Sequence, residues 1–123
     1  MTPIIFAVIV LYEVDVRDCI TYRELLRAAA FNQNTQRMSI LLYDNSSEAQ
    51  TPGVLPDGVL YHHAARNGGV AAAYNYALQL ALAQNSEWLL TLDQDTSLPE
   101  HFLSHMLACV ASCLLYTSPS PRD

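Results

Sequence analysis

The sequence predicts an α/β domain with a Rossmann-like, mostly parallel sheet and helices on both faces. Residues 4–11 and 38–43 are continuous apolar runs rich in Ile, Val and Leu, which is typical of strands buried on both faces. Segments with helical spacing or high helix propensity, residues 19–32 and 70–83, separate the expected strands. Strands that alternate with helices favour a parallel sheet whose crossover helices cover its faces.

The first half of the chain holds two expected strands and one helix. Residues 4–11 form the first strand, and Asp18 is the expected N-cap of a helix over residues 19–32. The second strand, residues 38–43, is followed by DNSSEAQTPG, a stretch dense in turn-forming residues. This half therefore predicts one strand, helix, strand unit.

The second half holds two further strands and two helices. Residues 59–62 form a short third strand, and RNGG breaks the chain before an Ala-rich helix over residues 70–83. Residues 87–92 form the fourth strand, and a last helix begins near Pro99 because proline suits the first turn of a helix. Two aromatic side chains are expected in the core, Trp88 and Phe102.

The charge and the cysteines exclude several classes of protein. Six Lys and Arg residues stand against twelve Asp and Glu, for a formal net charge of -6, which argues against a nucleic-acid-binding surface. Cys19, Cys109 and Cys113 lack the spacing of a disulfide framework or a zinc site and are expected to be reduced thiols of a cytoplasmic protein. The apolar N-terminal run is too short for a transmembrane segment or a signal peptide. Peripheral association with the inner face of the cell membrane stays open.

The end of the chain differs in character from the rest. Residues 113–123, CLLYTSPSPRD, resemble the translation of a transposon-type sequencing adaptor. Helical periodicity is expected to stop at Cys113, where a Ser/Pro alternation that cannot continue a helix begins. A natural proline-rich linker is the alternative. On the adaptor interpretation, residues 1–112 are a truncated piece of a longer protein, and the tail is not native.

Polar side chains follow three of the expected strands, at the point where each strand ends. Ligands of open parallel sheets bind beyond the carboxyl ends of the strands. Two neighbouring acids in one of these clusters repel each other when ionised, so they require solvent, a proton or a cation; a solvated turn is the alternative to a site. The clusters are Tyr12, Glu13 and Asp15 after the first strand, Asp44, Asn45, Ser46 and Ser47 after the second, and Asp93, Gln94 and Asp95 after the fourth.

Four segments together resemble the nucleotide-binding half of family 2 glycosyltransferases with the GT-A fold, especially the bacterial rhamnosyltransferase-like branch. The segments are VIVLYEVD, ILLYDNSS, NGGVAAAYNYAL and WLLTLDQDTSLPEHFL, and they cover nearly all of residues 4–112. One departure is Glu13, at a position that is often Asn in this family. The resemblance implies that residues 1–112 are the nucleotide-sugar-binding part of the enzyme. It also implies that the general base and the acceptor site lie in a missing C-terminal half, so this chain is expected to be inactive in transfer.

The resemblance implies a reaction, a donor and a metal ion. The donor is dTDP-rhamnose or a UDP-sugar, and the parent enzyme transfers the sugar with inversion to a cell-surface glycan. Mg2+ or Mn2+ bridges the acidic protein and the diphosphate, because these ions favour carboxylate and phosphate oxygens. Asp95 is expected to coordinate the ion directly, while Asp93 contacts the ribose or a water on the ion.

The same resemblance implies contacts for the nucleotide itself. Asp44 is expected to accept a hydrogen bond from the ring N–H of the base, and Tyr12 to lie against the base. Asn67 and Gly69 shape the loop before the second helix, whose N-terminus offers amides to an anion. Structural roles remain the alternatives: a turn cap for Asp44, a strand-end aromatic for Tyr12 and a flexible hinge for the glycines.

Two other functions remain open at this point. LLTLDQDTS also resembles the nucleophile loop of haloacid-dehalogenase-like phosphatases, in which Asp93 would attack phosphate. That motif places Thr or Val four residues after the first Asp, where this chain has Ser97. A non-catalytic nucleotide-binding module is the other alternative. The glycosyltransferase interpretation requires that Asp44 and Asp95 open onto one shared cleft.

Overall fold

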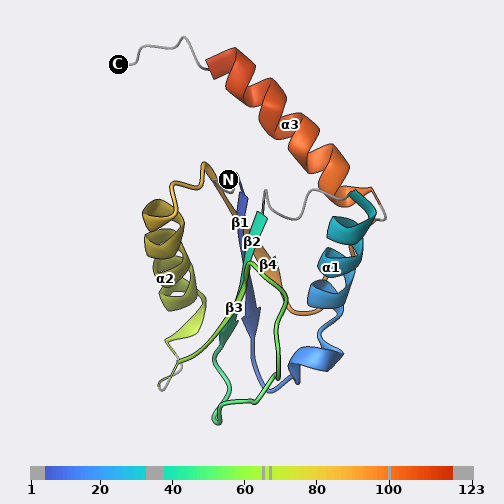
Figure 1. Cartoon of the computed structure of the whole chain (residues 1–123). Helices are drawn as coiled ribbons and strands as arrows, with labels where there is room; N and C mark the ends of the chain where they lie inside the picture. The colour runs from blue at the N-terminus through green and yellow to red at the C-terminus, as the bar shows by residue number, and fades with distance from the viewer. Residues whose placement is uncertain (1–4, 33–37, 65, 67, 100, 118–123) are drawn as a thin grey trace.

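The described part of the chain forms a four-stranded parallel sheet with three α-helices, and the predicted fold class is confirmed (Figure 1). The computed structural model describes residues 5–32, 38–64, 66, 68–99 and 101–117. The strands lie in the order β3-β2-β1-β4, and every neighbouring pair is parallel. In chain order the elements are β1 (Ile5–Leu11), the 3-10 turn η1 (Val16–Asp18), α1 (Ile20–Asn32), β2 (Met38–Asp44), β3 (Val59–His63), α2 (Gly69–Ala83), β4 (Trp88–Asp93) and α3 (Phe102–Thr117).

Helices α1 and α2 cover opposite faces of the sheet (Figure 1). Side chains of a strand point alternately to the two faces, so β1 contributes Ile5, Ile9 and Leu11 to one core cluster and Phe6 and Val8 to the other. Strands β1 and β2 are buried along almost their whole length. The continuous apolar runs therefore mark the two central strands, as expected for a sheet covered on both faces.

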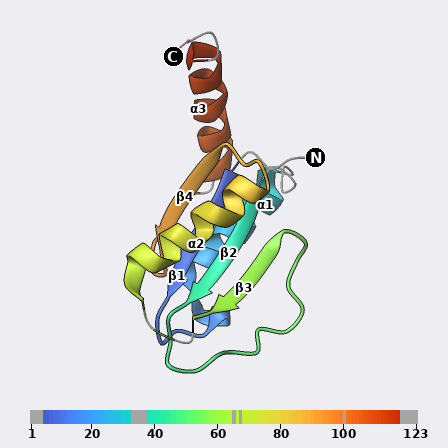
Figure 2. The same ribbon diagram turned by 90° about the vertical axis from the view of Figure 1, so that its left-hand side faces the viewer.

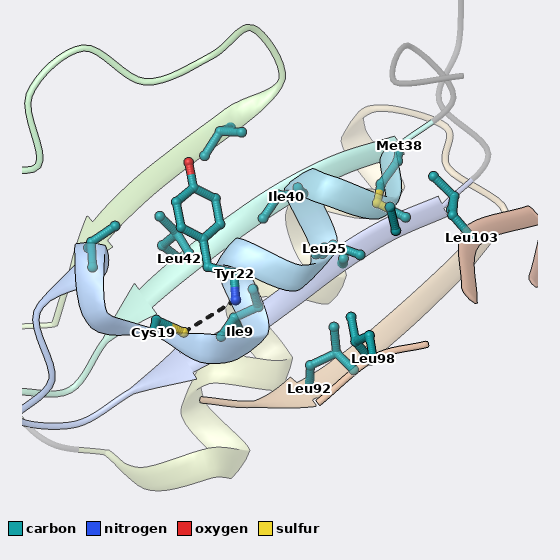
Figure 3. Close-up of a cluster of buried hydrophobic side chains, with 14 of the residues drawn as sticks. Ile9, Cys19, Tyr22, Leu25, Met38, Ile40, Leu42, Leu92, Leu98 and Leu103 are labelled. Atoms are coloured by element: carbon teal, nitrogen blue, oxygen red, sulfur yellow. Dashed lines mark hydrogen bonds between the residues drawn. The ribbon is translucent and has the colours of Figure 1, made fainter. Parts of the chain in front are cut away.

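The α1 side of the sheet holds the larger aliphatic core (Figure 3). Leu25 of α1 is fully buried among side chains from β1, β2 and β4. Cys19, just before α1, accepts a hydrogen bond at its sulfur from the Tyr22 amide, 3.4 Å away (Figure 3). The prediction that Asp18 caps this helix is wrong, because Asp18 belongs to η1 and Cys19 stands between it and α1. Asp15 caps that turn instead, through the Arg17 amide.

The α2 side is packed through small residues. Ala73, Ala77 and Ala81 are buried, one turn apart, against apolar side chains of β1 and β2. Because alanine has the highest helix propensity and little bulk, this stripe both favours the helix and lets it pack closely on the sheet. The Ala-rich prediction for this segment is confirmed, with one residue added at its start.

The edge strand β4 and helix α3 differ from the expectations in two respects. Trp88 is 38% exposed, so its expected place in the core is wrong: it begins an edge strand that pairs on one side only, with β1. Phe102, in contrast, packs against the α1-side core. Helix α3 extends away from the sheet (Figures 1 and 2) and continues to Thr117, past Cys113. The expectation that helical structure stops at Cys113 is therefore wrong.

Candidate functional site

The parallel register brings three loops together at the carboxyl edge of the sheet. Leu11 at the end of β1 pairs with Asp44 at the end of β2, and Val10 pairs with Asp93 at the end of β4. The loops that follow these strands therefore begin side by side. The prediction that the polar clusters share one edge of the sheet is confirmed by this register.

Asp44 is a buried hydrogen-bonding centre of this edge. Its relative exposure is 0%, and its carboxylate accepts three hydrogen bonds. Oδ1 accepts from the Ser46 amide at 3.0 Å, and Oδ2 accepts from the Tyr61 hydroxyl at 2.6 Å and from Gln50 Nε2 at 3.1 Å. With these three donors in place and no exposed surface, the Asp44 carboxylate is not open to a ligand in this arrangement.

The hydrogen bonds decide the charge of Asp44. Burial raises the pKa of the carboxyl, but the bonds from Ser46, Tyr61 and Gln50 outweigh burial and hold the pKa below its ordinary value. Burial and the bond to Asp44 together raise the pKa of Tyr61, so its hydroxyl keeps the proton that it donates. Asp44 is therefore an ionised carboxylate whose charge is met by three donors of the chain.

Gln50 joins the loop after β1 to the loop after β2. Its Nε2 also donates to the Val14 carbonyl at 2.7 Å, and its Oε1 accepts from the Val16 amide at 2.8 Å. Its own amide donates to the Tyr61 hydroxyl at 2.9 Å. Sequence analysis missed Gln50 and Tyr61, and no local signal marks them, since their role comes from contacts between three separate segments.

Glu13 makes a second clamp between the same two loops. Its φ of 53° lies in the left-handed region, which non-glycine residues seldom adopt outside turns and functional sites. The Glu13 amide donates to Ser46 Oγ at 2.6 Å, and its Oε2 accepts from the amide and the hydroxyl of Ser47 at 2.9 and 2.8 Å. These Ser47 bonds lower the pKa of Glu13, so its carboxylate stays ionised.

A cleft of about 420 Å3 lies between these loops. Tyr12, 54% exposed, stands next to Glu13 in the chain at this edge. Asp44, Asp93 and Asp95 do not line this cleft, and Asp44 is fully buried, so the expectation that Asp44 and Asp95 open onto one shared cleft is wrong for this cleft. The lining residues are Glu13, Val14, Asp15, Ser46, Ser47, Glu48 and Gln50.

The loop after β4 presents the acid pair to solvent. Asp93 and Asp95 are both exposed and flank Gln94, where the chain turns. Gln94 Oε1 accepts from the Tyr12 amide at 2.8 Å, which ties this turn to the loop after β1. The backbone of the turn also makes hydrogen bonds with the hydroxyl of Thr21, a fully buried residue of α1 that sequence analysis did not identify.

The donor set of the acid pair fits a hard divalent cation that shares its coordination with a ligand. Among the described residues, no group of three or more His, Cys, Asp or Glu side chains is placed to hold a metal ion. Mg2+ is commonly held by one or two carboxylates together with phosphate oxygens and waters. Asp93 and Asp95 supply carboxylate oxygens of this kind. Neither carboxylate accepts a hydrogen bond from another described residue; the bond that Asp93 accepts from Thr21 is at its backbone carbonyl.

The start of α2 lies near the same edge, as a hydrogen bond from the loop after β2 to Gly69 shows. Gly68 precedes the helix without a side-chain cap, and Gly69 has a φ of 79°. Asn45 Nδ2 donates to the Gly69 carbonyl at 3.4 Å, which connects the loop after β2 to α2. Asn67, the other predicted residue of this loop, lies outside the described residues. The adjacent histidines of β3 make different contacts: His62 stacks on Tyr76, while His63 Nε2 lies 2.8 Å from the Ser46 carbonyl oxygen.

No helix in the described part of the chain is long and apolar enough to cross a membrane. Comparison with curated proteins and with solved structures gives no significant match. The family model described as Glycosyl transferase family 2 matches residues 21–112, which is most of the chain and includes β2, β3, α2 and β4. The all-parallel sheet, the polar carboxyl edge and this match agree, and the chain belongs to glycosyl transferase family 2.

Proposed function

We propose that this chain binds a nucleotide-sugar donor at the carboxyl edge of the sheet, with the diphosphate held through Mg2+ or Mn2+. The observation that carries the proposal is the solvent-exposed acid pair Asp93 and Asp95, on the same edge as the cleft between the loops after β1 and β2. Family membership supplies the reaction class, which is sugar transfer. The finer proposal is a dTDP- or UDP-linked donor, rhamnose among the sugars, and a cell-surface glycan as the acceptor.

The nucleoside is proposed to occupy the cleft between the two loops. Its volume of about 420 Å3 lies within the range of small-molecule sites. The exposed ring of Tyr12 is proposed to lie against the base. Asp44 accepts from the base only after Gln50 gives up its bond; in the present arrangement it fixes the Ser46 to Gln50 loop that lines the cleft.

The charge of the edge explains why a cation is part of the proposal. The chain carries a formal net charge of -6, and Glu13, Asp15 and Glu48 line the cleft. A diphosphate placed beside these carboxylates is repelled unless a positive charge stands between them. When bound, the cation would neutralise the negative charge of the leaving diphosphate. Asp95 would hold it directly, and Asp93 would contact the ribose or a water.

The residues of the chain orient the donor rather than take a proton from the acceptor. The backbone amides in the first turn of α2 are proposed to face phosphate oxygens, with Gly69 shaping the loop that precedes them, because helix N-termini favour anions. We assign no general base among the described residues. The phosphatase alternative loses its support, since the family match identifies a glycosyltransferase and not a phosphatase.

A calorimetric titration tests the proposal. We expect dTDP or UDP to bind more tightly with Mn2+ than without it, and Asp95→Ala to remove this gain. The matched control is Asp57→Ala. Asp57 is an exposed aspartate just before the amino end of β3, so it lies away from the carboxyl edge of the sheet. Affinity that does not depend on Mn2+, or that both variants lose equally, would contradict the proposal.

A further inference from the structure

Thr21 holds the turn that carries the acid pair. It is fully buried in the first turn of α1, 72 to 75 positions from the residues that it contacts. Its Oγ1 donates to the Asp93 carbonyl at 2.5 Å, with the Thr96 carbonyl at 3.2 Å as a second acceptor. The same oxygen accepts from the Thr96 amide at 2.7 Å.

These partners are the two ends of the turn. In a closed β-turn the carbonyl of the first residue accepts directly from the amide of the fourth. Asp93 is the first residue here and Thr96 is the fourth, with the turn at Gln94 and Asp95. Here the Thr21 hydroxyl donates to the Asp93 carbonyl and accepts from the Thr96 amide, so it bridges the two ends of an open turn. Asp93 and Asp95 are the first and third residues of that bridged turn.

Cys19, just before α1, and the Thr21 backbone bond to the middle of the turn. The Thr21 amide and the Cys19 thiol both lie 3.4 Å from the Gln94 carbonyl and donate to it. Burial raises the pKa of the Cys19 thiol, which keeps the proton on its sulfur. Every residue of the turn except Asp95 is therefore bonded through its backbone to the first turn of α1 or just before it.

We propose that Thr21 is a positioning residue that sets the direction and separation of the Asp93 and Asp95 carboxylates for the cation and the diphosphate. The inference rests on the proposed function, since it concerns the same site. Only a group that both donates and accepts can bridge the ends of the turn, and a hydroxyl does so with a single atom. Partners that orient metal-binding side chains affect metal affinity although they do not touch the ion.

Three variants separate positioning from simple loss of stability. Thr21→Val keeps the shape of the side chain and removes the bridge, and Thr21→Ser keeps the hydroxyl. Ser39→Ala is the control, because Ser39 is a buried hydroxyl whose bond to Gln84 Oε1, at 2.9 Å, lies near the start of β2. We expect Thr21→Val to weaken Mn2+-dependent UDP or dTDP binding about 10- to 100-fold. Thr21→Ser and Ser39→Ala are expected to stay within about threefold of the parent.

The titrations distinguish failure of this inference from failure of the proposed function. If Asp95→Ala loses Mn2+-dependent binding while Thr21→Val retains it, or if Thr21→Ser loses as much as Thr21→Val, the inference is wrong and the function stands. If the parent chain shows no Mn2+-dependent binding, the proposed function is wrong and the inference falls with it.

A measurement on the parent chain decides the case in which Thr21→Val does not fold. Amide hydrogen exchange of Thr96 reports the bridge directly, because its N–H is the group that Thr21 Oγ1 accepts from. We expect the Thr96 amide to exchange more slowly than that of the exposed neighbour Ser97. Equal exchange rates at the two positions would overturn the inference.

Discussion

Replacing Tyr61 with Phe tests the hydrogen-bond network around Asp44. The change removes the hydroxyl that donates to Asp44 Oδ2 at 2.6 Å and accepts from the Gln50 amide at 2.9 Å. A hydrogen bond to a charged group contributes about 1.5–3 kcal/mol, and a buried donor left without its partner costs about 1–3 kcal/mol. Because Tyr61 is only partly buried, water replaces some of this loss. We therefore expect Tyr61→Phe to lower the free energy of unfolding by about 2 kcal/mol at pH 7.

The pH dependence gives the same prediction a second, independent readout. The folded-state pKa of Asp44 lies below its ordinary value, so its contribution to stability is present above the unfolded pKa and is lost as the pH falls through the folded pKa. In Tyr61→Phe one of the bonds that lower this pKa is gone, and the folded pKa rises. The difference in stability between parent and variant should therefore be largest at neutral pH and shrink below about pH 4.

Urea denaturation followed by circular dichroism measures both effects. Tyr74→Phe is the control, because the Tyr74 hydroxyl has no hydrogen bond to another described residue. We expect this control to stay within about 0.5 kcal/mol of the parent. A loss below about 0.5 kcal/mol in Tyr61→Phe at pH 7, or a loss that stays constant into acid, would refute the reasoning.

Two further substitutions test the core and the start of α2. Leu25→Ala should lower the free energy of unfolding by about 2–5 kcal/mol in urea denaturation, because Leu25 is fully buried, whereas Leu78→Ala, at a position 45% exposed, should change it by less than about 1 kcal/mol. Gly69→Ala should destabilise the protein by about 1 kcal/mol, since its φ of 79° disfavours a side chain although nothing lies within 4 Å of the added Cβ. Gly53→Ala, with a φ of 81° and the same open surroundings, should cost the same stability in thermal denaturation but leave nucleotide affinity unchanged. Equal losses of affinity in both glycine variants would contradict the role of Gly69.

Much of the fold could be predicted because local patterns determine it. The apolar runs of β1 and β2 predict central strands, and the alanines of α2 predict a closely packed helix. The exposure of Trp88 could not be predicted in this way, because it depends on β4 being an edge strand. The order of strands in a sheet is a long-range property that a hydrophobic pattern does not contain.

The site was predictable in its location and not in its supporting contacts. Parallel strands bring their carboxyl ends to one edge, so Asp44 and Asp93 could be placed together from the sequence. The burial of Asp44 depends on Tyr61 and Gln50, which come from other segments and carry no motif. The contact of Thr21 with the Asp93 loop likewise joins residues far apart in the chain, and propensity and spacing describe only near neighbours.

Paramagnetic broadening by Mn2+ in the presence of UDP or dTDP tests most directly the claim that the carboxyl edge binds a cation together with a nucleotide. In amide NMR spectra we expect the strongest broadening at Gln94 and Asp95, with weaker effects at Glu13 across the edge. Helix α3 offers a contrasting site, because the His101 and His105 rings lie 6.2 Å apart between centroids. Broadening that is centred on this histidine pair, or that is the same without nucleotide, would contradict the account.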